Sequence, residues 1–113
     1  MLDRVQQDGA VVPPLWVQEV GNVLLHAMRR GRLAAEAVPE RLALLDMLPI
    51  SVDTGGIGPV WRSNVLTLAQ TEGLTFYDAV YLELAIRRGL RLATNEQALR
   101  RAAYRRGAAP ALA

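Results

Sequence analysis

The chain has 113 residues, of which 51% are hydrophobic and 21% charged, so its composition is that of one globular domain and excludes a disordered chain. It has no cysteine, which excludes disulfides and thiolate metal sites and fits a reducing cytoplasm. The formal net charge is a mild +2, and all thirteen basic residues are arginine. Because His26 is the single histidine, any catalysis is expected to rest on carboxylates.

The first half of the chain alternates helical and strand patterns. The expected elements are a helix through Leu2 and Val5 that ends at Gly9, a strand at 10–12, helices at 15–30 and 34–47, and a strand at 49–53. The helix at 15–30 has an apolar stripe that predicts its buried face, made of Val17, Val20, Leu24, Ala27 and Met28. No apolar run is long enough to span a bilayer, so no membrane segment is expected.

The second half continues the alternation. The expected elements are a glycine-rich loop at 54–59, helices at 60–72 and 76–88, a strand at 91–94, a basic helix at 95–106 and a last strand at 109–112. Strands that are separated by helices indicate a parallel sheet covered on both faces. The sequence therefore predicts an α/β fold in a single domain over residues 1–113.

Asp78 lies at the start of the 76–88 helix, which is apolar almost all round. Between Ala79 and Ile86 the only charged residue is Glu83, so this helix is expected in the middle of the fold. The pattern Thr75-x-x-Asp78 has the spacing of a capping box, and an acid in the first turn suits the helix dipole. On these residues alone, the capping role is favoured over a catalytic one.

Three further acids stand near strand ends, each with a structural explanation of its own. Glu19 lies on the edge of an apolar stripe, Asp53 precedes a glycine loop, and Glu96 follows Thr94 in a second capping-box spacing, Thr94-x-x-Gln97. Ligands of parallel α/β sheets bind at the carboxyl ends of the strands. A convergence of Glu19, Asp78 and Glu96 there would make a site for Mg²⁺ or Mn²⁺, which prefer oxygen ligands.

Three segments together resemble those of PIN-domain proteins, in particular the VapC toxins. Residues 13–24 look like the helix that carries a family glutamate, 73–85 resemble the "LTxYDAxYLxLA" segment, and 92–99 resemble the "LATxDxxL" segment. The motifs occur in the family's order and extend over almost the whole chain. The resemblance implies a three-layer α/β/α fold with a parallel sheet.

The resemblance also implies a function. VapC-like proteins are Mg²⁺- or Mn²⁺-dependent endoribonucleases of type II toxin–antitoxin pairs, which act on RNA in the cytoplasm, form homodimers and bind a VapB antitoxin. Glu19 and Asp78 match family acids, and Glu96 occupies a position that is usually Asp. These three are the expected catalytic residues and metal ligands. Thr75, Thr94 and Asn95 are their expected supporting neighbours.

Two departures from the family pattern modify this expectation. The family's first acid lies in a "DxS" segment on a central first strand, which has no counterpart here, so an N-terminally incomplete domain with strand edges exposed at 10–12 and 91–94 is expected. Glu96 in place of Asp adds a methylene, and a displacement of one ångström can cost about a hundredfold in rate.

Both the role of the basic helix and the overall function have an alternative interpretation. Arg100, Arg101, Arg105 and Arg106 are candidates to contact RNA phosphates, although a solvated helix face is slightly favoured. The alternative function is a catalytically inactive module that docks an antitoxin or dimerises. A third interpretation is an unrelated α/β domain in which the acids are only helix caps.

Overall fold

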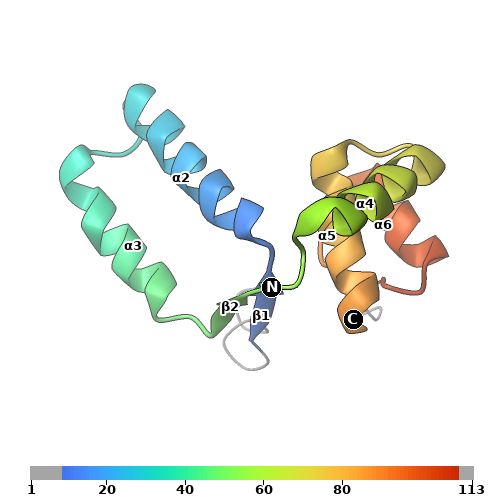
Figure 1. Ribbon diagram of the computed structural model, residues 1–113. Helices are drawn as coiled ribbons and strands as arrows, with labels where there is room; N and C mark the ends of the chain where they lie inside the picture. Colours follow the sequence, from blue (N-terminus) through green and yellow to red (C-terminus); the bar gives the residue numbers. More distant parts are fainter. Residues whose placement is uncertain (1–8, 110–113) are drawn as a thin grey trace. The chain divides into compact units, whose positions relative to one another are not determined.

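Two short strands, β1 (Ala10–Val12) and β2 (Ile50–Val52), pair in parallel, as Figure 1 shows. Ala10 lies opposite Ile50 and Val12 opposite Val52. The backbone N–H of Asp53 donates to the carbonyl oxygen of Val12 at 2.7 Å and extends the ladder by one bond. The strands predicted at 10–12 and 49–53 and their parallel pairing are therefore confirmed.

The computed structural model describes residues 9–109, and the chain divides into two compact units, residues 1–53 and 54–113. In the first unit, β1 and β2 are connected by α2 (Pro14–Arg29), a 3₁₀ turn η1 (Ala35–Ala37) and α3 (Val38–Asp46). Pro14 occupies the first turn of α2, where its missing N–H leaves no helical hydrogen bond unmade. Both predicted helices are thus present.

The apolar stripe predicted for α2 is only half-buried, at Val20, Leu24, Ala27 and Met28. No residue of this helix is buried, and Val17 is 53% exposed. A sheet of two three-residue strands is too small to cover a helix face, since independent sheets normally need three or more strands. Asp53 at the end of β2 is instead the buried charged residue of the part that the structure describes, 5% exposed.

The second unit is built from three helices, α4 (Gly58–Glu72), α5 (Phe76–Arg88) and α6 (Gln97–Arg105). Their apolar side chains share one core, made of Leu68, Leu82, Ala85, Leu99, Ala102, Ala103 and Ala108. Helix α5 supplies five buried residues, which confirms that the apolar stretch 76–88 lies inside this unit. It ends at Gly89, whose φ of 64° is a left-handed conformation that favours glycine.

The strand predicted at 91–94 is wrong. Residues 91–94 form no regular structure, and the segment is held by one backbone bond, from Leu92 N to Ala108 O at 2.7 Å, and by Arg91 Nη1, which donates to Ala109 O at 2.8 Å. A strand is defined by a ladder of bonds to a neighbour, and within residues 9–109 no strand pairs with this segment.

The remaining expectations fall at the chain ends. The helix predicted to end at Gly9 and, apart from Ala109, the strand predicted at 109–112 lie outside the described residues. Across residues 9–109 the structure is mixed α/β, with five α-helices and a two-stranded parallel sheet, so the predicted fold class is confirmed. In that range, no helix combines the length and the apolar character that a membrane crossing requires.

Candidate functional site

Asp78 is fixed by the helix start that the sequence predicts. Thr75 is the N-cap of α5, and its Oγ1 accepts a hydrogen bond from the backbone N–H of Asp78 at 3.1 Å. Asp78 is half-buried, and it is the acidic residue of the first turn. The predicted cap is confirmed. The cap engages the backbone of Asp78, so its carboxylate remains available for a ligand.

Glu96 begins the next helix, in a way that differs from the prediction. It is the N-cap of α6, and its backbone N–H donates to Thr94 Oγ1 at 3.2 Å. The predicted capping box between Thr94 and Gln97 is therefore wrong, because the Thr94 hydroxyl closes a turn two residues ahead instead. Asn95 and Glu96 are both exposed, and Thr94 is half-buried.

Asp78 and Glu96 each lie at the start of a helix, α5 and α6 respectively, and both helices pack into the same core. Asp78 precedes the fully buried Leu82 by four residues, and Glu96 precedes the buried Leu99 by three. Residues at these spacings lie on one face of a helix. Leu82 and Leu99 belong to one apolar cluster, which ties the orientation of α5 to that of α6.

Glu19, the third predicted acid, belongs to the other unit of the chain. It lies in α2, where it is exposed, whereas Asp78 and Glu96 lie in the second unit. Over residues 9–109 there is no group of three or more histidine, aspartate or glutamate side chains that could hold a metal ion. The oxygen donors of Asp78 and Glu96 nevertheless suit Mg²⁺, which often binds through only one or two carboxylates and keeps several waters.

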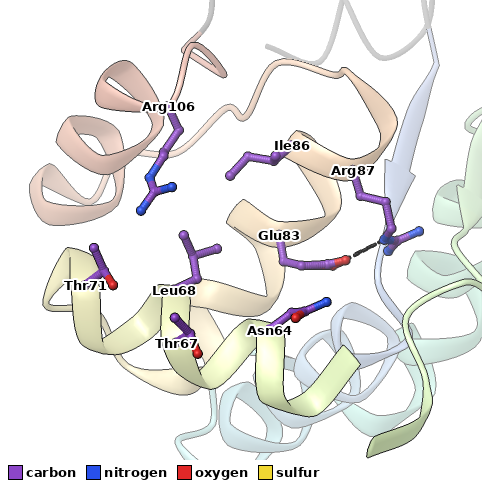
Figure 2. Close-up of a pocket in the computed structure, with 8 residues that line it drawn as sticks. All are labelled: Asn64, Thr67, Leu68, Thr71, Glu83, Ile86, Arg87 and Arg106. Carbon is purple, nitrogen blue, oxygen red and sulfur yellow. Dashed lines mark hydrogen bonds and ion pairs between the residues drawn. The ribbon is translucent and has the colours of Figure 1, made fainter. Parts of the chain in front are cut away.

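A second acid of α5, Glu83, forms a network that the sequence analysis did not identify. Its Oε2 accepts a hydrogen bond from Trp61 Nε1 of α4 at 3.1 Å, and Arg87 pairs with both of its carboxylate oxygens, as Figure 2 shows in part. The Trp61 ring also meets Phe76 edge-on, with ring centroids 6.2 Å apart. The Glu83–Arg87 spacing of four was a readable signal, whereas the Trp61 contact was not.

Trp61 holds the α4 and α5 helices together over the first half of α5. Phe76 and Glu83 lie on either side of Asp78 in the chain, and Trp61 contacts both. The preceding loop packs against the same ring, since a Cβ added to Gly56 would lie 3.0 Å from Trp61 Nε1. A side chain at residue 56 would therefore displace either the loop or the indole.

The predicted RNA-contacting arginines of α6 are largely engaged within the second unit. Arg105 Nε donates to Glu72 Oε1 at 2.7 Å and Arg106 Nε to Glu72 Oε2 at 3.0 Å, so one carboxylate of α4 holds two guanidinium groups. Arg101 Nη2 donates to Gln97 Oε1 at 3.3 Å. For Arg100, no side-chain partner occurs among residues 9–109.

Glu72 gives the second unit a pH-dependent contact. The hydrogen bond from Arg105, followed by that from Arg106, holds the pKa of Glu72 below its ordinary value of 4.5. Because the folded-state pKa is depressed, the stabilisation is present above pH 4.5 and is lost as the pH falls through the folded value. Glu72→Gln is expected to lower stability near neutral pH by about 1 kcal/mol, since both arginines are partly exposed.

The check is thermal melting of both proteins over a pH series. The difference in melting temperature between wild type and Glu72→Gln is expected to narrow as the pH falls from about 5 to about 3. Glu36→Gln, at an acid for which the structure shows no ion pair within residues 9–109, is the control. A difference that stays constant over this range would show that Glu72 is not the titrating group.

Comparison with protein families then assigns the chain. The model of the PIN domain matches residues 2–104, which is nearly the whole sequence. The chain belongs to the PIN domain family. Comparisons with curated proteins and with solved structures found no match.

Membership of the PIN family confirms the family part of the predicted resemblance. PIN domains are typically metal-dependent nucleases that act on RNA, so the family indicates a hydrolytic nuclease. The matched range includes Glu19, Asp78 and Glu96. It also includes the network of Trp61, Glu83 and Arg87, which no prediction had assigned.

Proposed function

We propose that this PIN domain is a metal-dependent endoribonuclease and the toxin of a type II toxin–antitoxin pair of the VapC kind. The observation that carries the proposal is the placement of Asp78. It lies in a motif that resembles the VapC segment, half-buried in the first turn of the central helix of its unit, with its backbone fixed by Thr75. The backbone that carries this acid is therefore already ordered before a ligand binds.

The carboxylates assigned to the metal are those of Asp78, Glu96 and Glu19. Mg²⁺ or Mn²⁺, when bound, supplies a Lewis acid for the phosphate and lowers the pKa of a coordinated water. The Thr94 hydroxyl accepts a hydrogen bond from the Glu96 N–H and so fixes the backbone that carries the Glu96 carboxylate. Asn95 lies between them in the same turn. Asp78 is supported by Thr75, the N-cap of α5, which accepts the bond from the Asp78 backbone N–H.

The partners and the location come from the VapC resemblance alone. We propose a VapB-like antitoxin as the protein partner, a homodimer as the assembly and the cytoplasm as the compartment. The antitoxin would have to be counteracted for RNA to be cut, since the resemblance implies that its peptide blocks the acids.

A second candidate is an inactive PIN module that binds an antitoxin or a second copy. One observation favours it: residues 9–109 hold no group of three acids or histidines suited to a metal ion. A chain that lacks a complete set of metal-binding acids would keep the surface that binds a partner and lose the hydrolysis of RNA.

An assay of metal-dependent cleavage separates the two candidates. The purified chain is incubated with a structured RNA in the presence of Mg²⁺, of Mn²⁺, or of a chelator. If the chain is an endoribonuclease, the RNA is cleaved internally with either ion and is not cleaved with the chelator, because hydrolysis of the phosphodiester requires the ion. Intact RNA under all three conditions, from a chain that melts cooperatively, would favour the binding module.

A further inference from the structure

A groove opens along the second unit, on a side of α5 that the acid site does not use. It has a volume of about 370 Å³ and is lined by Asn64, Thr67, Leu68, Thr71, Glu83, Ile86, Arg87 and Arg106. Figure 2 shows Leu68 and Ile86 pointing towards each other across its middle, with Arg106 reaching in from just beyond the end of α6. The volume falls within the range of small-molecule sites.

The polar groups around this apolar centre have unused hydrogen-bonding capacity. Arg106 uses Nε for Glu72, and its two terminal nitrogens make no hydrogen bond with any residue that the structure describes. The same holds for the side chains of Asn64, Thr67 and Thr71 within residues 9–109. These three lie on one face of α4, at the spacing of successive helical turns.

We propose that this groove binds one nucleotide of the RNA strand, away from the point of cleavage. The terminal nitrogens of Arg106 meet the phosphate, because a guanidinium offers paired donors that match phosphate oxygens. The base lies over Leu68 and Ile86, and its edge faces the hydroxyl and amide groups of α4. An apolar centre between one cation and a row of neutral donors and acceptors suits a base joined to a phosphate.

The inference rests on the proposed function, because it takes RNA as the substrate. Asp78 and Ile86 are eight residues apart on α5, which is about 12 Å along the helix axis at about 1.5 Å per residue. At about 100° per residue, the α5 residues that line the groove, Glu83, Ile86 and Arg87, point about 80–180° away from the direction of Asp78, so the groove faces another side of α5. The nucleotide held here is therefore farther along the strand than the neighbour of the one that is cut.

The charges of the groove favour an RNA strand over an acidic peptide. Glu83 lines the groove but is neutralised by Arg87, which leaves Arg106 as the cation directed into it. A single charge matches the single phosphate of each nucleotide. A run of acidic side chains would bring several carboxylates to a groove that offers one cation, and most of them would be left without a partner.

The test exploits a pair of arginines that differ in one respect. Arg105 and Arg106 bind the two oxygens of the same Glu72 carboxylate, but only Arg106 lines the groove. Arg106→Gln and Arg105→Gln therefore lose comparable ion pairs. Binding of a short fluorescent single-stranded oligoribonucleotide is measured in a chelating buffer, so that metal-dependent cleavage cannot affect the result.

Arg106→Gln is expected to weaken RNA binding by about tenfold relative to Arg105→Gln, the lower end for a hydrogen bond between charged groups. The slope of log affinity against log salt between about 50 and 200 mM is expected to fall by about 0.7 for Arg106→Gln. Equal losses of RNA affinity in both variants would contradict a nucleotide site in the groove. They would instead indicate that RNA contacts the basic C-terminal end of α6 as a whole. Failure of the wild type to bind RNA would overturn it as well.

The apolar contact has its own matched pair. Ile86 and Leu66 are both exposed, 42% and 51%, but only Ile86 lines the groove. Ile86→Ser is expected to weaken RNA binding and Leu66→Ser to leave it unchanged. Equal effects, or displacement of the RNA by a poly-glutamate peptide that binds through Arg106, would contradict a nucleotide site. Because all these measurements omit metal, metal-dependent cleavage by the wild type tests the proposed function separately.

Discussion

Replacing Asp78 with asparagine is expected to lower kcat for metal-dependent RNA cleavage by at least about a hundredfold, because loss of a metal-bound carboxylate removes several kcal/mol of transition-state stabilisation. The fold should survive. The cap bond joins Thr75 Oγ1 to the backbone N–H of residue 78, which asparagine retains. Only the interaction of the charge with the helix dipole is lost, worth about 0.3–1 kcal/mol.

The control for Asp78→Asn is Glu40→Gln. Glu40 is the acidic residue in the first turn of α3, so its replacement removes the same kind of helix-dipole interaction. Steady-state cleavage rates and melting temperatures are measured for both variants. Unchanged cleavage by Asp78→Asn, or an equal loss in Glu40→Gln, would remove Asp78 from the catalytic site.

Leu82→Ala is expected to give the largest loss of stability in the second unit. Leu82 is fully buried in the cluster that joins α4, α5 and α6, so its truncation leaves a cavity among Leu68, Ala85 and Leu99. Substitutions of this kind cost about 2–5 kcal/mol in unfolding free energy. In a small unit this is a large part of the total stability.

The measurement is unfolding by denaturant, followed by far-ultraviolet circular dichroism, with Leu66→Ala as the matched variant. Leu66 lies two residues before Leu68 in α4 and is 51% exposed, so its truncation is expected to change stability by less than about 0.5 kcal/mol. If the two variants unfold at the same denaturant concentration, the assigned core is wrong.

Helix α5 could be predicted from the sequence because its determinants are local. Thr75 caps its first turn and Gly89 takes the left-handed conformation at its end, and both signals lie within a few residues of the helix. The apolar run between them also predicts burial. No distant partner is required for any of these inferences, and all of them are confirmed.

The strand at 91–94 could not be predicted because a strand depends on its neighbour. Leu92 and Ala93 have a suitable local pattern, but only one backbone bond connects the segment to Ala108. The capping box predicted at the start of α6 was wrong for a different reason, which is local. Thr94 has two competing uses for its hydroxyl, and the structure uses it for the turn at Glu96.

The side-chain interactions of the second unit also divide into local ones, which the sequence indicates, and distant ones, which it does not. The Glu83–Arg87 pair has a spacing of four and was readable on a helix. Glu72 meets Arg105 and Arg106 across 33 and 34 residues, and Trp61 meets Glu83 across 22, so only the packing of the helices reveals them. The groove also depends on this packing, since its lining comes from α4, α5 and the end of α6.

Asp78 is proposed as a metal ligand, and a titration with Mn²⁺ measures this role without depending on cleavage. The signal of free Mn²⁺ in electron paramagnetic resonance is followed as wild type, Asp78→Asn and Glu40→Gln are added. A saturable site is predicted in wild type and Glu40→Gln, with affinity at least about tenfold weaker in Asp78→Asn. Equal binding by all three proteins, or no saturable binding by the wild type, would contradict the claim.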